Sequence, residues 1–308
     1  MKVRIGVGLS VGNVLRSPND LCSVVDILED LAFDSLWMSD SRVGLALDPM
    51  AALAFAAGRT RRLKLGTNVV VLPGRDPVLL ARQMALIDQL SAGRLLPAFG
   101  LGKPLDGDPS PIEVKRGERA RMFEENLAFI RQLWDQDGGV SHPGGGPPVF
   151  IHPRPIKPLE VWFGGRSERA LQRAGRLSDG WIGNFLMPEE VAAARKIIQD
   201  AAATVGRQIE QDHFGTTIYY VRDSRTRFAL KHVTKAMAYC GCYIPGPADC
   251  PPRFEQVMLP LGEDEICELV SQYVEQGLSK FVMIPADTPA SWDAELTWLR
   301  KVTAQLEN

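Results

Sequence analysis

The sequence predicts an α/β fold, a closed (β/α)8 TIM barrel with insertions over the C-terminal face of its strands. Eight short apolar runs are typical of buried strands, helical segments separate nearly all of them, and no change of composition divides the chain. The runs lie near residues 3, 36, 65, 96, 161, 181, 217 and 282. We therefore expect one domain over residues 1–308, with insertions at about 103–112, 136–159 and 240–260.

The first half of the chain alternates strand and helix. Residues 3–9 are the first predicted strand, and a helix with one apolar face is predicted up to residue 31. Residues 33–40 give a link and a second strand that ends on Asp40. Asp48 and Pro49 are typical of a helix start. Residues 62–102 then hold a strand, a helix and a second strand, which together form one βαβ crossover.

The second half continues this alternation around two irregular stretches. Residues 113–134 are predicted to form a long helix, and the Gly- and Pro-rich stretch that follows is an expected excursion over one end of the fold. A mixed segment at 224–261 holds a predicted helix near 227–239 and then a loop. The remaining strands are predicted at 161–163, 179–183, 214–221 and 280–285, with helices after each of them.

Composition restricts the class of protein. The chain has 308 residues, 45% hydrophobic and 23% charged, and its formal net charge is −2. This balance argues against a nucleic-acid or membrane-surface binder. No apolar run reaches about 18 residues, and no signal-peptide pattern precedes the first strand. Because five cysteines are few and odd in number, we expect reduced thiols in a cytoplasmic protein.

The active site of such a barrel lies at the C-terminal ends of its strands, so those ends are read as one group. The group offers backbone and amide groups but few acids or bases. It consists of Ser10, Asp40, Asn68, Val69, Gly100 to Lys103, Gly164 to Ser167, Gly183 and Asn184. Gly164 to Ser167 directly precede a helix, so free N–H groups, the helix dipole and Arg166 could hold a phosphate. The alternative is a tight turn without a ligand.

Metal chemistry is not expected. Cys240 and Cys242 have no second pair at zinc-like spacing. The four histidines are also expected to lie outside the chemistry: His142 and His152 as exposed residues of the excursion, His213 and His232 as packing or surface residues. A phosphate site with so few acids and bases suits a bound cofactor that carries the reaction itself.

Seven short stretches, taken together and in order, resemble the luciferase-like monooxygenase superfamily, and within it the coenzyme F420 (deazaflavin)-dependent oxidoreductases. The stretches are 33–40, 65–69 with 75–77, 90–94, 100–102, 121–134, 162–165 and 178–181. The resemblance covers nearly the whole chain outside the insertions. It implies a (β/α)8 barrel that binds deazaflavin or flavin at the strand ends.

The resemblance also implies roles for residues. It places a non-proline cis bond at Asn68–Val69 behind the ring. It places Gly100, Leu101 and Gly102 along the ring, and a phosphate at Gly164, Gly165, Arg166 and Ser167. Gly183 is a further cofactor-binding candidate from the group of strand ends.

Two residues are candidates for catalysis. Asp40 matches an acidic residue near the reacting face, and Lys103 follows the Gly-x-Gly of residues 100–102. An orienting or purely structural role is the alternative for each. The chain departs from similar enzymes in having Ser41 where they often carry His, and Lys103 where some carry an acid. The proton donor therefore stays open.

The implied function is a cytoplasmic oxidoreductase that moves a hydride between F420 and a small organic substrate. It would act as a homodimer, without nucleic-acid or membrane partners. An FMN-dependent monooxygenase on the same barrel is the first alternative, and a non-catalytic flavin- or deazaflavin-binding protein is the second. An NAD-linked doubly wound enzyme would need a glycine fingerprint that the first strand lacks. The substrate and the direction of hydride transfer are left open.

Overall fold

The structure, a computed structural model, describes residues 2–10, 15, 18–40, 47–102, 114–115, 117–142, 144–239 and 253–307. Its strand segments form one parallel sheet in the order β4-β6-β7-β8-β9-β10-β1-β2-β3-β5. The segments are β1 (Arg4–Leu9), β2 (Ser35–Met38), β3 (Lys64–Thr67), β4 (Val70–Val71), β5 (Leu95–Leu96), β6 (Ala98–Gly100), β7 (Trp162–Gly164), β8 (Gly180–Asn184), β9 (Phe214–Tyr220) and β10 (Lys280–Pro285).

These ten segments are eight strands of a closed barrel, because two strands are interrupted. β3 and β4 are separated only by Asn68 and Val69, and β5 and β6 only by Pro97, which has no N–H to donate to a neighbouring strand. β3 pairs with β5 and β4 pairs with β6, so the two halves of one interrupted strand pair with the two halves of the other and the sheet closes on itself. The predicted barrel is confirmed, with the difference that two uninterrupted strands were expected here.

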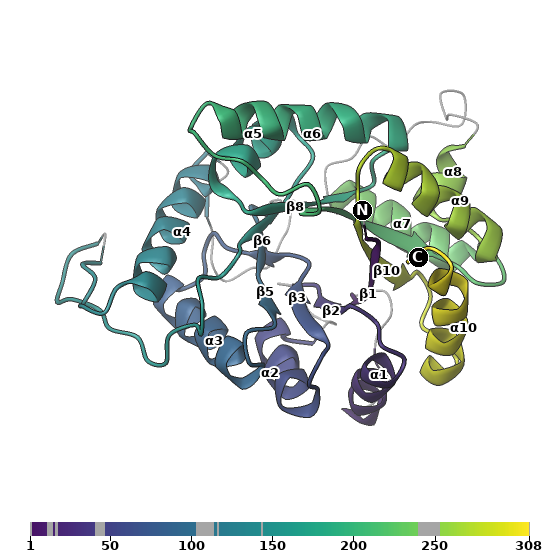
Figure 1. Cartoon of the computed structure of the whole chain (residues 1–308), viewed down its shortest axis with the longest axis horizontal. Coiled ribbons are helices and arrows are strands. Elements are labelled where there is room, and N and C mark those ends of the chain that lie inside the picture. The colour runs from purple at the N-terminus through teal and green to yellow at the C-terminus, as the bar shows by residue number, and fades with distance from the viewer. Residues whose placement is uncertain are drawn as a thin grey trace.

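Helices surround the barrel, as Figure 1 shows. They are α1 (Pro18–Asp30), α2 (Pro49–Arg59), α3 (Pro77–Leu90), α4 (Arg119–Asp135), α5 (Glu168–Leu177), α6 (Pro188–Ala203), α7 (Arg227–Tyr239), α8 (Phe254–Met258), α9 (Gly262–Glu275) and α10 (Trp292–Ala304). Sequence signals explain several starts: the side chains of Asp48, Asp76 and Ser167 each accept a hydrogen bond from a backbone N–H in the first turn. Among the described residues, no helix has the length and apolar character needed to cross a membrane.

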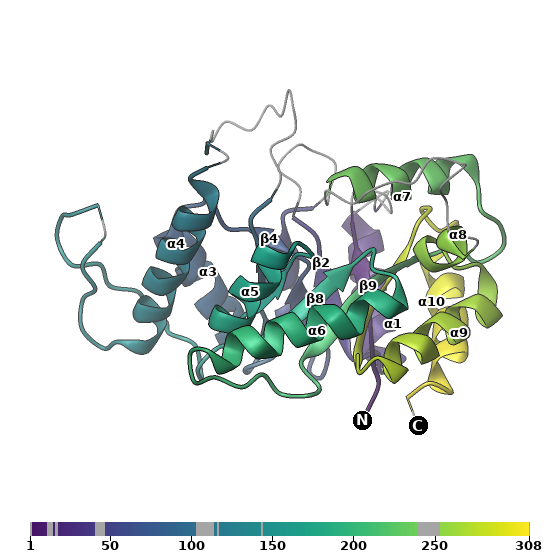
Figure 2. The same cartoon turned by 90° about the horizontal axis from the view of Figure 1, so that it is seen from above.

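Side chains along β9 alternate between the two sides of the barrel wall. Tyr220 points outward, where its ring lies 6.0 Å from that of Trp298 on α10. Thr217 points inward, because its hydroxyl accepts a hydrogen bond from Asn68 on a strand that is not adjacent to β9. Tyr219, two residues further along, shares the inward side with Thr217. Figure 2 shows α7 at the end of the barrel opposite both termini, which is the end where the strands finish.

Three expectations outside the strands differ in detail. Helix α4 begins at Arg119, not near residue 113, and the expected insertion at 103–112 lies outside the described residues. The excursion at 136–159 contains an antiparallel bridge between Val140 and Val149. The stretch expected as a loop at 240–260 contains α8, whose five residues are too few to show a helical period.

Candidate functional site

The interruption between β3 and β4 lies at the C-terminal end of the barrel. The Asn68–Val69 peptide bond is cis. The Asn68 side-chain amide donates to the Thr217 hydroxyl across the barrel at 2.9 Å, and the Asn68 backbone N–H donates to the Met38 carbonyl oxygen at 2.8 Å. These two hydrogen bonds hold Asn68 against β2 and β9 and direct the next residue, Val69, toward β6 and β7.

Three glycines make room for the chain after this bond. A β carbon at Gly100 would lie 2.6 Å from Cγ2 of Val69, and one at Gly164 would lie 3.1 Å from Cγ1 of Val69. At Gly102, where φ is +64°, a β carbon would lie 2.6 Å from Cγ1 of Val71. We call Gly100, Gly102 and Gly164 with the two valines the glycine cradle. It brings the ends of three strands into direct contact.

Asp40 lies beside the cradle, and both of its carboxylate oxygens accept hydrogen bonds from the protein. One carboxylate oxygen accepts from the Val71 backbone N–H at 3.1 Å, and the other accepts from the Arg75 guanidinium at 2.8 Å. The Asp40 side chain is only 3% exposed. Its contacts fix the position of β4 and the following turn. The second candidate catalytic residue, Lys103, and Ser41 lie outside the described residues.

The predicted phosphate turn has the expected backbone. Gly165 has φ of +120°, and its carbonyl oxygen accepts from the Trp181 indole N–H at 2.8 Å. Ser167 caps α5, so the turn leads straight into a helix N-terminus. The Arg166 guanidinium, however, donates to the Phe185 carbonyl oxygen at 2.9 Å and pairs with Glu190 at 3.2 Å. Its charge is therefore compensated within the protein, which leaves backbone N–H groups as the main donors for an anion.

The two remaining predicted residues take different places. Gly183 is buried in β8, its carbonyl oxygen accepts from the Thr216 hydroxyl at 3.3 Å, and a β carbon there would overlap Trp181 and Leu186. Leu101 is half-buried beside the cradle. The structure thus brings Asp40, Asn68, Val69, Gly100, Gly102 and Gly164 together, with the turn at 165–167 adjoining, while Gly183 serves packing within its strand.

An aromatic group at the same end was missed from the sequence. The Phe185 and Tyr219 rings are stacked, with centroids 5.3 Å apart and planes 8° apart. His232 belongs to α7, and its ring centroid lies 5.8 Å from that of Tyr219. His232 was expected to be an ordinary packing or surface residue. The alternation of β9 could have placed Tyr219 inward, but nothing local in the sequence connects residue 232 to that strand.

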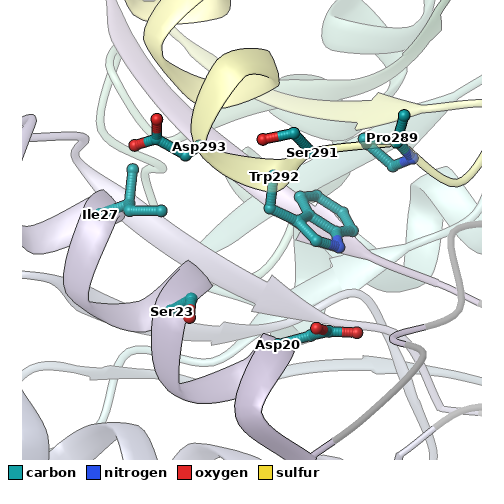
Figure 3. Close-up of a pocket in the computed structure, with 8 residues that line it drawn as sticks. Asp20, Ser23, Ile27, Pro289, Ser291, Trp292 and Asp293 are labelled. Atoms are coloured by element: carbon teal, nitrogen blue, oxygen red, sulfur yellow. The ribbon is translucent and has the colours of Figure 1, made fainter.

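A separate cavity of about 350 Å³ lies between α1 and the start of α10 (Figure 3). Asp20, Ser23, Trp292 and Asp293 are among its lining residues. It belongs to the outer ring of helices and shares no residue with the cradle. In the described part of the chain, no group of three or more His, Cys, Asp or Glu residues could hold a metal ion.

The family model described as luciferase-like monooxygenase matches residues 2–247, and the chain belongs to this family. An uncharacterised protein of Mycobacterium tuberculosis is 31% identical over 209 residues, which are 65% of this chain and 72% of that protein. The F420-dependent glucose-6-phosphate dehydrogenase of Amycolatopsis mediterranei is 29% identical over 234 residues, 67% of this chain and 69% of that protein. The family expected from the sequence is therefore confirmed, with F420-dependent enzymes among its relatives.

Solved structures support the same fold. An F420-dependent secondary alcohol dehydrogenase, solved with an F420–acetone adduct, superposes with a TM-score of 0.83 at 18% identity and covers 100% of both chains. The FMN-bound oxygenating constituent of 3,6-diketocamphane monooxygenase from Pseudomonas putida superposes with a TM-score of 0.73 at 16% identity and covers 99% of both chains.

Proposed function

We propose that this protein is an F420-dependent oxidoreductase that moves a hydride between the deazaflavin and a small organic alcohol or carbonyl compound. The observation that carries the proposal is the glycine cradle, in which Val69 lies against Gly100 and Gly164 where the strands end. The relationship to an F420-dependent glucose-6-phosphate dehydrogenase favours this cofactor and this type of substrate.

The residues of the site fit such a cofactor. The cradle presents the half-buried Val69 and Leu101, with glycine backbone between them, which suits one face of a flat ring. The backbone of Gly164, Gly165 and Ser167 before α5 suits its phosphate, since a helix N-terminus favours an anion. Asn68, Gly102 and Arg166 complete the proposed cofactor-binding set, and Gly183 would support it only through its packing within β8. The bound cofactor would supply or accept the hydride.

The chain's own residues would position the cofactor and the substrate and exclude water from them. Asp40 holds the Val71 N–H and the Arg75 guanidinium, so we assign it a positioning role beside the reacting face and not a proton-transfer role. Lys103, directly after Gly102, remains a proposed catalytic residue. The substrate class, alcohol or carbonyl, is the one whose oxidation or reduction requires one hydride and one proton.

Titration of the purified protein with F420 and, separately, with FMN tests the proposal. We expect saturable F420 binding, followed by absorbance and fluorescence, and turnover of reduced F420 with at least one member of a panel of ketones. The FMN-dependent monooxygenase on the same barrel is the second candidate, favoured by the likeness to the FMN-bound oxygenase. Tight FMN binding with reduced-nicotinamide oxidase activity would establish that candidate, and binding of neither cofactor would defeat both.

We also propose that the protein forms a homodimer through α2 and α3. Large apolar side chains are exposed on these neighbouring helices: Phe55 on α2, and Leu79, Leu86 and Leu90 on α3. The three leucines are spaced by seven and four residues and therefore share one helix face. Exposed apolar residues gathered in this way are typical of a protein–protein interface.

A further inference from the structure

His232 lies on α7, the helix at the end of the barrel where the strands finish (Figure 2). Thr217 contacts Asn68 across the barrel, and Tyr219 lies on the same side of β9, one step nearer the strand end. The Tyr219 ring has Phe185 stacked on it and the His232 ring 5.8 Å away. The three rings therefore form one group at the same end of the barrel as Asn68, a residue of the proposed cofactor site.

Two buried polar atoms in this region have no hydrogen-bond partner among the described residues: Nε2 of His232 and Oδ1 of Asp287. Asp287 comes just after β10, and its other oxygen accepts from the Thr226 hydroxyl at 2.9 Å. That hydroxyl also accepts from the Ala229 N–H in the first turn of α7. Asp287 is thus tied to the helix that carries His232, and neither of the two buried atoms has its hydrogen-bonding capacity used within the described part of the chain.

The other three histidines lie elsewhere. His213 precedes β9 at the opposite end of the barrel, where its Nδ1 lies 2.8 Å from the Asp179 carbonyl oxygen. His142 lies against Phe129 of α4, and His152 is exposed in the excursion. Asp40 has both carboxylate oxygens occupied. Among the described histidines, His232 is the one whose buried Nε2 has no hydrogen-bond partner in the described part of the chain.

We propose that His232 is the proton-transfer residue of this site, acting at Nε2, and that Asp287 is the acidic residue that tunes it. The role rests on the proposed function. In carbonyl reduction, the imidazolium gives its Nε2 proton to the substrate oxygen as a hydride adds to the carbonyl carbon. The C=O π bond breaks, C–H and O–H bonds form, the substrate gains two electrons that the reduced deazaflavin loses, and His232 is left neutral. Alcohol oxidation is the reverse.

The surroundings of His232 set the pH range. Burial lowers the pKa of His232 below its usual value, the Lys235 ammonium lowers it further, and the Asp287 carboxylate opposes both. Tyr219 faces it from β9. Reduction needs the protonated ring, so its rate should fall as the pH rises through this pKa, whereas oxidation should gain rate over the same range.

The first test is histidine NMR titration of the full chain, with His232→Asn used to assign the resonance. We expect a lowered His232 pKa that falls further in Asp287→Asn, and a change in this titration when oxidised F420 is added. His152→Asn is the control and should change neither. A His232 titration that responds neither to Asp287→Asn nor to F420 would overturn the proposal, whatever the activity.

The second test uses reduced F420 and the ketone panel. We expect His232→Asn to bind F420 with nearly wild-type affinity, to lose roughly 10²–10⁴-fold in kcat, and to lose the pH dependence. A His232→Asn variant with wild-type kcat and pH profile would overturn this inference while leaving the F420-dependent function in place. If the wild type bound no F420, the proposed function would fail and the inference with it.

Discussion

Lys280 is a buried cation at the start of β10, at the end of the barrel opposite the candidate site. It is 3% exposed, and its ammonium nitrogen lies 3.1 Å from Oδ2 of Asp34. The same nitrogen lies about 6 Å from the ring centres of Trp37 and Trp162 (5.9 and 5.8 Å). Lys64 pairs with the second Asp34 oxygen at 3.2 Å. Asp34 thus neutralises a cation that the barrel interior could not otherwise tolerate.

Removing Asp34 should therefore destabilise the protein strongly. We expect Asp34→Asn to lower the free energy of unfolding by about 3–5 kcal/mol, because Lys280 stays buried without a partner. Asp34→Asn combined with Lys280→Met should recover much of this loss. Asp26→Asn, which breaks an exposed pair with Arg59, is the control and should change stability by about 1 kcal/mol or less. Urea unfolding at neutral pH measures all three, and a loss for Asp34→Asn no greater than the control's would contradict this account.

Asp34 should also make the free energy of unfolding depend on pH in the acid range. Burial alone would raise the pKa of Asp34, but the ammonium groups of Lys280 and Lys64 and the Ser35 hydroxyl outweigh burial and lower it. A folded-state pKa below the unfolded one stabilises the fold at higher pH, and this contribution is lost as the pH falls through the folded-state value. Unfolding measured from neutral to acid pH should therefore show a smaller acid loss in Asp34→Asn than in the wild type.

At the scale of elements, the cradle depends on how three strand ends meet. Val69 reaches β6 and β7 only because Gly100 and Gly164 have no side chain. We expect Gly100→Ala to destabilise the protein by about 1–3 kcal/mol, since its methyl group would overlap Val69. F420 affinity should fall about tenfold or more, because the surface proposed to face the ring is displaced.

A second substitution tests the cause of that effect. Val69→Ala removes the atom that the new methyl group would meet and leaves the Val69 β carbon at 3.8 Å, an ordinary contact. The double variant should therefore regain stability relative to Gly100→Ala alone. Gly58→Ala on α2, where a β carbon has nothing within 4 Å, is the matched control and should be neutral or stabilising. Additive effects of the Gly100 and Val69 substitutions would contradict the contact.

Most elements could be predicted from the sequence because they depend on local periodicity and turn residues. The eight strands and the helix starts at Pro49 and Pro77 are examples. The pairing of Arg166 with Glu190 could not be predicted, since it depends on the angle at which α6 returns to the barrel. The position of His232 depends in the same way on how α7 crosses the strand ends. Cradle membership could be predicted only through the family resemblance.

At the scale of the whole molecule, the exposed apolar residues are unevenly distributed. Phe55, Leu79, Leu86 and Leu90 lie on α2 and α3, which are neighbours in Figure 1 and lie across the barrel from α6. A stable dimer buries about 800 Å² of surface on each partner. An arginine introduced at the centre of such an interface would be buried without a partner for its charge. The exposed apolar face of α2 and α3 could not be predicted from the sequence alone, because the sequence does not distinguish an exposed leucine of a helix from a buried one.

We therefore expect Leu86→Arg to convert a dimer to a folded monomer in analytical ultracentrifugation. Val205→Arg, an equally exposed apolar position just after α6, is the control and should leave the association state unchanged. Circular dichroism would show whether each variant keeps its fold. A wild type that sediments as a monomer, or a Leu86→Arg variant that stays dimeric, would contradict the proposed interface.

The most direct test of the central claim is a crystal structure of the protein soaked with F420. We predict that the deazaflavin ring lies against Val69 and the backbone of residues 100–102, with its phosphate at the turn of residues 164–167 before α5. A ring bound elsewhere, for instance in the cavity between α1 and α10, or a phosphate far from that turn, would contradict the account.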